Sequence, residues 1–519
     1  MNRSIIFILL ITFAISHNGN SQLKSEEVNA LVETTLEKFG SAGMAVGIVK
    51  DGTIIHSKGY GIKSKNSNDY VNEHTQFAIA SNSKAFTTTA LAILVEQGKI
   101  DWDDKVIEHI PEFKMYNSYV TENFTIQDLL THRSGLGLGA GDLMFIPEGS
   151  DFTIQDILSN FQYFEPQSAF RTKYDYDNIL YIVAGELIAR VSGQSWEDFV
   201  QNNIFKTLGM QNTFSSFSSI KSTNKLATPF LIKNGNLEPI SHFEQTANGA
   251  AGGIISTVAD MCQWMLVHLN HGKYGSNNEN ELFTLDTQRE MWRIHNSHVS
   301  YPAEPYNSHF SGYGLGWELT DVQGKMVAYH SGLLPGMASM TILVPDLELG
   351  IVVMINTSDE VGNSPVEPIV LTILDKYLQI PDNDWVNKVH KRLQSRTSIA
   401  DSVVITVWET VEQANDDHIV ADNYVGIYED NWFGQVEISK RNDQLWFQSF
   451  RSPKLNGRLQ YYKANSFAVK WEYQKLNADA FVIFSLNQEG KAKGIKLKGI
   501  SPEMDFSFDF QDLNLIRVE

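Results

Sequence analysis

Apolar positions spaced for helices and for a hairpin mark the first part of the chain. Apolar residues at intervals of three and four predict helices over residues 28–36, 82–97, 181–191 and 257–268. Thr-x-x-Asp boxes beginning at Thr125, Thr153 and Thr257 place an oxygen acceptor before a carboxylate, which favours helix starts. β-Branched and aromatic runs over residues 44–50 and 53–60 are joined by Asp51-Gly52, a pair suited to a tight turn. A hairpin followed by a helix-rich stretch is therefore predicted.

Farther along, the pattern changes from helical to strand-like. Short runs divided by polar or glycine-bearing turns predict strands over residues 314–319, 326–330, 337–344 and 350–355. Residues 366–378 again have helical spacing and predict a helix that closes against this sheet. The last hundred residues predict strands over residues 435–439, 444–447, 467–471, 481–485 and 495–497. Many short strands at regular spacing indicate a small antiparallel barrel or sandwich.

The N-terminus has the pattern of an export signal. Asn2 and Arg3 form a short basic start, and the apolar run over residues 5–15 is too short to span a bilayer comfortably. We predict a secretory signal peptide cleaved before Gln22, a periplasmic or secreted protein, and no stable membrane association after cleavage; a retained anchor is the alternative. The predicted organisation is a signal peptide (1–21), a large domain (22–380), a linker with some helix around residues 385–393 (381–422) and a C-terminal β domain (423–519).

Composition and charge narrow the class of partner. A chain of 519 residues is too long for one ordinary core, and its 42% hydrophobic residues are typical of a globular protein. The net charge of −20 repels phosphate backbones and anionic lipids, which disfavours nucleic-acid binding and peripheral membrane docking. A small molecule or a neutral polymer is the expected partner, and the oligomeric state is left open.

Cysteine and histidine usage gives no sign of a disulfide or a metal site. Cys262 is the single cysteine, so neither an intrachain disulfide nor a cysteine-based zinc cluster is available. Two His-x-x-His pairs, at His268/His271 and His295/His298, lack acidic partners and the context of a zinc site. We expect neither a metal nor an organic cofactor.

The strongest local signal for chemistry is a serine at the start of a predicted helix. An apolar stretch over residues 77–80 leads to Ser81, and Lys84 follows three residues later. Positions i and i+3 share a helix face, so the lysine amine can approach the hydroxyl and, when screened from water, serve as its base. Ser83 lacks a lysine at this spacing. Taken alone, Ser-x-x-Lys is also explained by a capping serine and a solvated lysine.

Two further groups of residues widen the pattern. Tyr176-Asp177-Asn178 supplies a phenol that could share proton transfer with a nearby lysine and an amide that could hold both lysine and substrate. A turn with a buried tyrosine is the plainer alternative. His330-Ser331-Gly332 ends a predicted strand, where a backbone N–H could act as an oxyanion donor and glycine allows close approach of substrate. A lone histidine there is otherwise structural.

In this order and with these separations, the three groups resemble the serine β-lactamase and penicillin-binding-protein superfamily, specifically its class C β-lactamase and esterase branch. Further stretches resemble the family: residues 126–136, 208–213, 252–260 and 313–317. The resemblance covers residues 28–378 and implies an α+β fold, with an antiparallel sheet flanked by helices and a mostly helical subdomain. The C-terminal module is similar to the small lipocalin-like β barrels appended to several of these hydrolases, where the barrel shapes or caps the active-site cleft.

The resemblance also implies roles for individual residues. Ser81 would attack an acyl carbon to give an acyl-enzyme, Lys84 and Tyr176 would handle protons, and Asn178 would position the substrate. The backbone N–H groups of Ser81 and Leu333 would form the oxyanion hole, and Ser331 and Gly332 would contact the substrate. His132 and Asp260 are expected to be scaffold residues.

One departure from the family bears on the substrate. Class C β-lactamases carry a lysine at the third motif, which helps to hold the β-lactam carboxylate, whereas this chain has His330. Histidine offers less fixed charge near neutral pH, so we expect weak β-lactamase activity and an ester, amide or peptide substrate. The alternatives are a D-alanyl carboxypeptidase or D-aminopeptidase acting on peptidoglycan fragments, and a non-catalytic sensor of cell-wall or β-lactam ligands.

Overall fold

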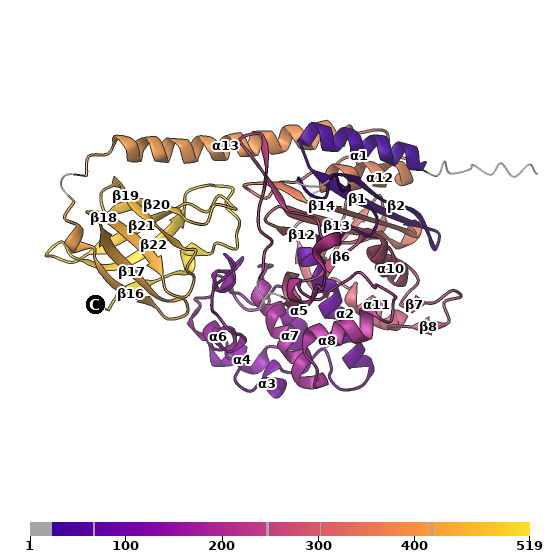
Figure 1. The fold of residues 1–519 in the computed structure, drawn as a ribbon. Coiled ribbons are helices and arrows are strands. Elements are labelled where there is room, and N and C mark those ends of the chain that lie inside the picture. The colour runs from indigo at the N-terminus through magenta and orange to yellow at the C-terminus, as the bar shows by residue number, and fades with distance from the viewer. Residues whose placement is uncertain (1–22, 66–67, 245–248, 301–302, 417–418, 519) are drawn as a thin grey trace, which may run out of the picture.

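The structure is a computed structural model that describes residues 23–65, 68–244, 249–300, 303–416 and 419–518. The predicted signal peptide and its cleavage site before Gln22 lie outside these residues. A domain built on an antiparallel sheet lies beside a C-terminal barrel, and a long helix runs along both (Figure 1). Within the described ranges, no helix has both the length and the apolar character needed to cross a membrane.

The central sheet has eight strands in the described part of the chain. Their order is β2-β1-β14-β13-β12-β11-β10-β9, and each strand is antiparallel to its neighbours. The strands are β1 (Gly43–Lys50), β2 (Thr53–Gly61), β9 (Asn296–His298), β10 (Ser311–Tyr313), β11 (Glu318–Val322), β12 (Lys325–Leu334), β13 (Met337–Val344) and β14 (Leu349–Ile355). The predicted hairpin is confirmed, with Asp51 and Gly52 at φ 50° and 71° in its turn.

Helices cover both faces of this sheet. On one face, α1 (Ser25–Phe39) and α12 (Val366–Leu378) pack against alternate strand residues such as Val46 and Ile351. On the other face, α10 (Val258–Leu269) packs against β1 and β14, where residues such as Ala45 and Val352 are buried, and α2 (Ser83–Glu96) belongs to the same hydrophobic core. Side chains that alternate between two buried faces explain why the central strands are apolar throughout. Helix α12 closes the sheet as the sequence predicts.

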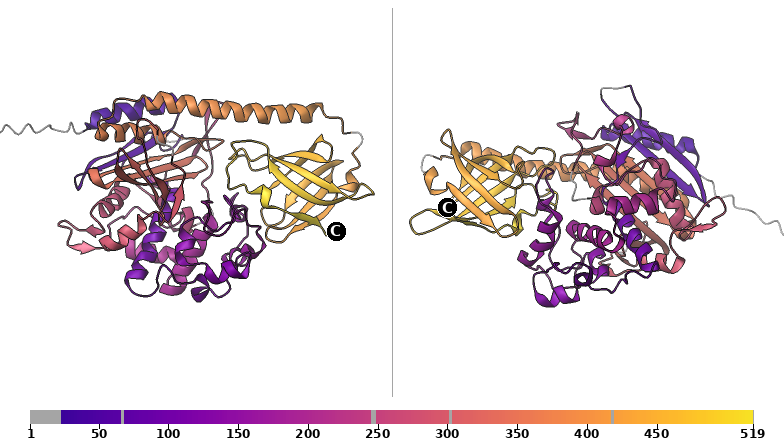
Figure 2. Two further views of the ribbon diagram at one scale, coloured as in Figure 1. Left: turned by 180° about the vertical axis from the view of Figure 1, so that it is seen from behind. Right: turned by 60° about the horizontal axis from the view of Figure 1, so that its bottom comes forward.

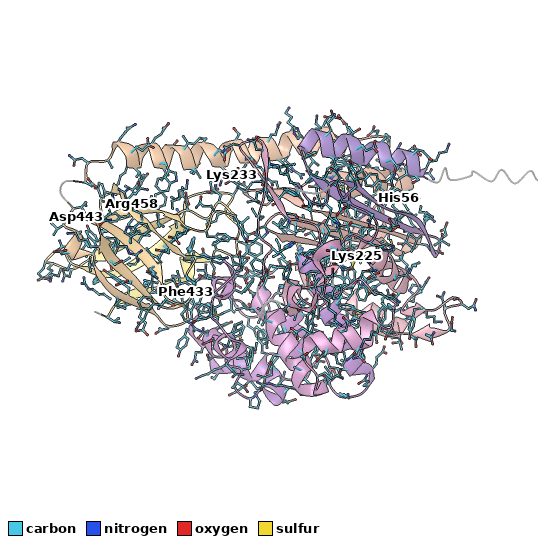
Figure 3. The ribbon with its side chains drawn as sticks, in the orientation of Figure 1. His56, Lys225, Lys233, Phe433, Asp443 and Arg458 are labelled. Atoms are coloured by element: carbon cyan, nitrogen blue, oxygen red, sulfur yellow. The ribbon has the colours of Figure 1, made fainter. Side chains whose placement is uncertain are left out.

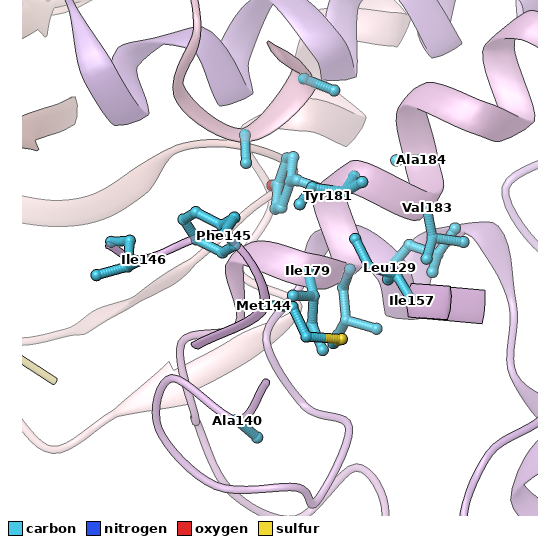
Figure 4. Packing of buried hydrophobic residues seen from close by; sticks show 14 of the residues in the cluster. Leu129, Ala140, Met144, Phe145, Ile146, Ile157, Ile179, Tyr181, Val183 and Ala184 are labelled. Atoms are coloured by element: carbon cyan, nitrogen blue, oxygen red, sulfur yellow. The ribbon is translucent and has the colours of Figure 1, made fainter. Parts of the chain in front are cut away.

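A helical subdomain lies below the sheet in Figure 1. Its helices are α3 (Val106–His109), α4 (Ser118–Asn123), α5 (Ile126–Leu130), α6 (Ile154–Asn160), α7 (Asn178–Ser192) and α8 (Trp196–Val200). Helix α7 is buried from its first turn onwards, and its residues Ile179 and Val183 lie close to Leu129 and Ile157 of neighbouring helices (Figure 4). The boxes at Thr125 and Thr153 cap α5 and α6, and the threonine before α10 accepts a hydrogen bond from its own box. These helix starts were predicted correctly.

Smaller elements connect the two layers. They are α9 (Gly249–Gly252), α11 (Leu285–Met291), the three-stranded sheet of β15 (Thr357–Asp359), β4 (Phe230–Lys233) and β5 (Asn236–Pro239), and the pairs β3 (Phe77–Ala78) with β6 (Ile255–Ser256) and β7 (Lys273–Tyr274) with β8 (Asn280–Glu281).

One predicted strand, over residues 314–319, is wrong over its first four residues. Residues 314–317 form a turn between β10 and β11. Gly316 has φ +77°, and a Cβ there would lie 2.6 Å from Thr88 Oγ1 and 3.0 Å from Lys84 O. The turn bends this segment towards helix α2, a tertiary contact that local periodicity does not report.

The predicted linker is largely one helix, α13 (Trp385–Gln413), of 29 residues. At its start, the Trp385 indole donates to Asp375 of α12 (2.7 Å). Near its end, the Trp408 indole donates to Asp479 of the barrel (3.1 Å), and Val407 and Val411 pack on barrel residues. The sequence predicted helix only around residues 385–393, because few positions along α13 are buried and its composition is polar.

The C-terminal strands form a closed antiparallel barrel within the described residues. It consists of β16 (Gly426–Asp430), β17 (Gly434–Arg441), β18 (Gln444–Ser449), β19 (Asn456–Lys463), β20 (Ser466–Trp471), β21 (Ala480–Leu486), β22 (Ala492–Gly499) and β23 (Leu515–Arg517). Strands β16, β19 and β23 were not predicted. The barrel lies beside the helical subdomain in both views of Figure 2, and Phe433 lies on the side that faces α6 (Figure 3). Its ring packs against Phe152 with centroids 6.0 Å apart.

Candidate active site

Ser81 lies in a short 3-10 turn (Ala80–Asn82) that leads directly into α2. Ala80, the residue before it, has φ +48°, a conformation that is unfavourable for a residue with a Cβ and is often found at functional sites. Lys84 follows on the same face of the helix, fully buried, with Nζ 3.2 Å from Ser81 Oγ. The predicted contact between the Ser81 hydroxyl and the Lys84 amine is therefore present.

Lys84 is held by acceptors from two other elements. Its amine donates to Asn178 Oδ1 (2.7 Å) and to the carbonyl oxygen of Ala251 in α9 (2.9 Å). The rings of Tyr176 and Tyr181 lie 4.7 and 5.3 Å from Nζ. Burial lowers the pKa of Lys84 from 10.5 to about 7, against the opposing effect of the nearby Asp142 charge. A large part of the lysine population is therefore neutral near pH 7 and able to accept a proton.

Tyr176 and Asn178 flank the start of α7. The Tyr176 phenol is within hydrogen-bonding reach of Ser81, and burial raises its pKa well above the usual value of 10, so it stays protonated at neutral pH. Asn178 is the first residue of α7 and is buried. The structure thus places both predicted residues at the Ser81–Lys84 pair. Of these groups, the lysine is the one that titrates near neutrality.

The third group of predicted residues lies on β12, beside the Ser81 turn. A Cβ on Gly332 would lie only 2.2 Å from Ile79 O and 3.0 Å from the Ala80 Cβ, so glycine is required for this close approach. Ser331 and Leu333 flank Gly332, and all three line the same cavity as Ser81. The strand extends to Leu334, beyond the predicted end at residue 330.

His330 is buried and held neutral. Its Nδ1 lies 2.6 Å from the Ser331 carbonyl oxygen, which can only accept, so Nδ1 carries the proton. The other ring nitrogen, Nε2, then accepts from the Tyr313 hydroxyl at 3.0 Å. Burial, helped by the charge of Lys84, lowers the pKa of His330 to about 3. The third motif, where the resemblance led us to expect little fixed charge, is therefore uncharged at neutral pH.

These residues surround a cavity of about 300 Å³. Seven of the eight predicted site residues line it, and Lys84 lies behind Ser81, out of contact with the cavity. The lining residues among them are Ser81, Tyr176, Asn178, His330, Ser331, Gly332 and Leu333. Ser83, the rejected alternative, accepts a hydrogen bond from the Ile254 N–H and is fully buried.

The residues expected to be scaffold have structural contacts. His132 Nδ1 accepts from the Asp177 N–H (3.1 Å), and its ring lies 4.2 Å from that of Tyr176, so it supports the loop before α7. Asp260 accepts from the Asn212 N–H and the Thr213 hydroxyl. Over the described ranges there is no group of three or more His, Cys, Asp or Glu residues arranged to hold a metal ion.

Sequence reasoning missed several groups around the cavity. Asp142, at the end of a glycine-rich stretch, is fully buried and accepts from Asn178 Nδ2 at 2.8 Å. Glu318 of β11 lines the cavity and accepts from the Tyr174 hydroxyl at 3.0 Å. Four more lining residues come from the barrel: Leu476, Asp505, Phe506 and Ser507. The run of alternate glycines from Gly135 to Gly141 was the available signal for Asp142, and none pointed to the barrel residues.

An antiparallel sheet flanked by helices, with a serine one turn ahead of a buried lysine, supports a serine hydrolase. The family model described as Beta-lactamase matches residues 28–372, and the chain belongs to the β-lactamase family. A second model, described as a domain of unknown function (DUF3471), matches residues 411–517 and so includes the barrel.

Curated relatives and solved structures agree with this assignment. The chain is 27% identical over 375 residues to "Unguisins hydrolase ungD'" of Aspergillus campestris, covering 70% of this chain and 68% of that protein. It is 26% identical over 348 residues to "Protein flp" of Staphylococcus aureus, with 64% of each chain covered. This chain therefore matches about two thirds of the length of these relatives.

Two solved structures share the fold. The octameric penicillin-binding protein homologue from Pyrococcus abyssi has a TM-score of 0.59 at 18% identity and covers 95% of this chain and 100% of its own. A class C β-lactamase has a TM-score of 0.54 at 20% identity and covers 69% of this chain and 96% of its own. The first match extends over the barrel as well as the sheet domain.

Proposed function

We propose that this protein hydrolyses an ester or amide through an acyl-serine intermediate on Ser81. The observation that supports it most is Lys84: a fully buried amine 3.2 Å from the serine hydroxyl, with a pKa lowered to about 7. A base must be neutral at working pH to accept a proton, and an ordinary lysine is not. The hydrolase names among the relatives support the same class of reaction.

In the proposed reaction, Ser81 Oγ attacks the acyl carbon while its proton passes to Lys84. The tetrahedral oxyanion is stabilised by the N–H groups of Ser81 and Leu333, each a donor of the kind worth about 10²- to 10³-fold in rate. The protonated Lys84 and the Tyr176 phenol return a proton to the leaving group as its bond to the acyl carbon breaks. Water then attacks the acyl carbon and gives a proton to Lys84. Lys84 returns this proton to Ser81 Oγ as the bond between Oγ and the acyl carbon breaks, which releases the acid and restores Ser81.

A fluorophosphonate probe tests this proposal directly, because it bonds covalently to activated serines. We expect labelling of the wild type and none of Ser81→Ala. Ser83→Ala is the matched control, since it removes a neighbouring hydroxyl that is bonded to Ile254. Equal labelling of wild type and Ser81→Ala, or no labelling of either protein, would contradict the acyl-serine mechanism and favour a non-catalytic binding protein.

A second candidate, an aminopeptidase acting on peptides with a free amino group, is favoured by the charges around the cavity. Among the described lining residues there are two carboxyl side chains, Glu318 and Asp505, and neither a lysine nor an arginine. Burial raises the pKa of Glu318 to about 7, so its charge is present above that pH. A substrate ammonium would complement these carboxyls, whereas the terminal carboxylate of a carboxypeptidase substrate would be repelled.

A pair of amides separates this candidate from a general esterase. D-Alanyl p-nitroanilide should be cleaved faster than its N-acetyl counterpart, and the preference should shrink in Glu318→Gln. Glu238→Gln, at an exposed position of β5, is the control. Equal rates for the two amides would exclude the aminopeptidase and leave the ester panel, with a chromogenic cephalosporin as comparison, to define the substrate.

A further inference from the structure

A loop of the C-terminal barrel enters the active-site region of the sheet domain. Between β22 and the short turn at Phe510–Asp512, the Ser507 hydroxyl donates to Asp142 Oδ2 at 2.7 Å. Asp509 accepts from the backbone N–H groups of Gly141 (2.7 Å) and Leu143 (2.9 Å), on either side of Asp142. The barrel therefore contacts both the side chain of Asp142 and the backbone that carries it, and all these groups are buried.

The approach of this loop is close and specific. A Cβ on Gly139, which has φ +73°, would lie 2.6 Å from the Phe506 carbonyl oxygen. The Phe506 ring packs edge-on against Tyr176, with centroids 5.8 Å apart. Glycine is thus needed at position 139, where the backbone of Phe506 approaches the segment before Asp142, and the ring of the same phenylalanine contacts Tyr176.

Polar contacts outside the loop fix the barrel against the helical subdomain. Arg451 pairs with Asp151 (2.7 Å) and with both carboxylate oxygens of Asp156 (3.0 Å each). Asn160 donates to the carbonyl oxygen of Trp432 at 2.9 Å. A bidentate ion pair and a buried hydrogen bond have strict geometry, so together they favour one position of the barrel against the helical subdomain.

Asp142 relays this contact to the lysine through one amide. The same Oδ2 atom that accepts from Ser507 accepts from Asn178 Nδ2 at 2.8 Å, and Asn178 Oδ1 in turn accepts from Lys84 Nζ at 2.7 Å. A carboxylate can only accept, so Asp142 holds the NH₂ end of the amide and turns the oxygen towards the lysine. With the amide reversed, its NH₂ group would face the ammonium and leave that donor without an acceptor.

We infer that the barrel completes the active site: Ser507 and Asp509 hold Asp142, and Asp142 is a positioning residue that orients Asn178 towards Lys84. The inference rests on the proposed function, because it assigns these residues to the same lysine. It makes the C-terminal module part of the catalytic machinery, beyond its place as one wall of the cavity.

The charges around Asp142 and Lys84 predict the direction in which the pKa of Lys84 changes when the barrel contact is lost. Burial raises the pKa of Asp142 to about 7, while Asn178, Ser507 and the Lys84 charge act against this rise. The other titratable groups that face Asp142 or Lys84 are Asp177, Asp505, Asp509, Tyr176, Tyr181, His132 and His330. Removing the Ser507 donor makes the Asp142 carboxylate easier to protonate, and a neutral Asp142 no longer supports the charged form of Lys84. The pKa of the lysine then falls.

The test is the pH dependence of fluorophosphonate labelling in the full-length protein. Labelling requires neutral Lys84, so the wild-type rate should rise through about pH 7. In Ser507→Ala and in Asp142→Asn we expect the midpoint of this rise to move down by about half a pH unit or more, with a plateau about tenfold lower from misplacement of Asn178 and Lys84. Ser507→Thr keeps the hydroxyl that donates to Asp142, so its midpoint should return to the wild-type value.

Ser449→Ala is the matched control, since Ser449 is a buried barrel serine whose hydroxyl accepts from the Ser452 N–H, within the barrel. It should leave both midpoint and plateau unchanged. A lowered plateau with an unmoved midpoint in both Ser507→Ala and Asp142→Asn would indicate a merely structural role and overturn the inference, as would unchanged profiles. If the wild type shows no labelling that depends on Ser81, the proposed function fails and this inference fails with it.

Discussion

Replacing Lys84 by methionine separates the role of the lysine in catalysis from its effect on folding. Methionine keeps most of the side-chain volume but removes the amine, whose three acceptors are Ser81 Oγ, Asn178 Oδ1 and Ala251 O. Loss of a positioned general base lowers rates by about 10²- to 10⁴-fold. We expect a fall of that size in the rate of fluorophosphonate labelling and in the rate of hydrolysis of the p-nitrophenyl ester that the wild type cleaves fastest.

The same substitution changes how stability depends on pH. The pKa of Lys84 is about 7 in the folded protein and 10.5 as the unperturbed value, so between these pH values the unfolded chain holds a proton that the folded chain has released. The wild-type free energy of unfolding should therefore rise with pH by about 1.4 kcal/mol per unit, or about 2 to 3 kcal/mol from pH 7 to pH 9, relative to Lys84→Met. Below pH 7 the lysine is charged in both states, and this difference no longer changes.

Urea unfolding of both proteins at pH 7, 8 and 9, followed by tryptophan fluorescence, measures this difference. Asp142, whose pKa is raised from 3.8 to about 7, contributes mainly below this range: its stabilising contribution falls as the pH rises from 3.8 to 7. A stability difference that stays constant from pH 7 to pH 9 would show that the lysine is charged in the folded state. A loss of labelling smaller than tenfold would refute its role as base.

Three substitutions on the cavity wall give further expectations. Gly332→Ala, whose new Cβ would lie 2.2 Å from Ile79 O, should slow labelling by about 10²-fold while the circular dichroism spectrum is kept; a rate within twofold of wild type would contradict the required close approach. Phe506→Ala should raise the rate ratio of long-chain to acetyl p-nitrophenyl esters, because it removes a ring from the cavity; an unchanged ratio would show that the acyl group lies elsewhere. His330→Lys places a cation where the imidazole is neutral and should raise cephalosporin hydrolysis relative to ester hydrolysis by about tenfold. An unchanged ratio would contradict the inference that the neutral His330 disfavours β-lactam substrates.

Much of the sheet domain could be predicted because its signals are local. The threonine boxes, the Asp51-Gly52 turn and the apolar periodicity of α2 and α12 each act within a few residues of the element that they specify. The closeness of Ser81 and Lys84 is also local, since residues three apart at a helix start lie on one face, although this spacing alone did not exclude a capping serine and a solvated lysine. Their partners Tyr176, Asn178 and His330 were placed by their order along the chain, through resemblance to a known family.

The missed features depend on contacts between distant segments. Asp142 and Ser507 are 365 positions apart, and neither has a local pattern that points to the other. Helix α13 looks like a polar linker because it buries few side chains, such as Val389 and Ala400, along its length. The turn at residues 314–317 has the composition of a strand but is bent by its packing on α2. In each case tertiary structure decides what periodicity cannot.

Helix α13 has a further consequence for how the barrel works. A flexible linker would let the Ser507 loop diffuse away, and its effective concentration at Asp142 would be on the order of millimolar for a short tether. A helix anchored to α12 at its start and to the barrel near its end removes most of that freedom, so the entropy of docking is lost once, when the chain folds. Under the proposed function, each catalytic cycle would then begin with the loop already in place, and the two modules would act as one enzyme.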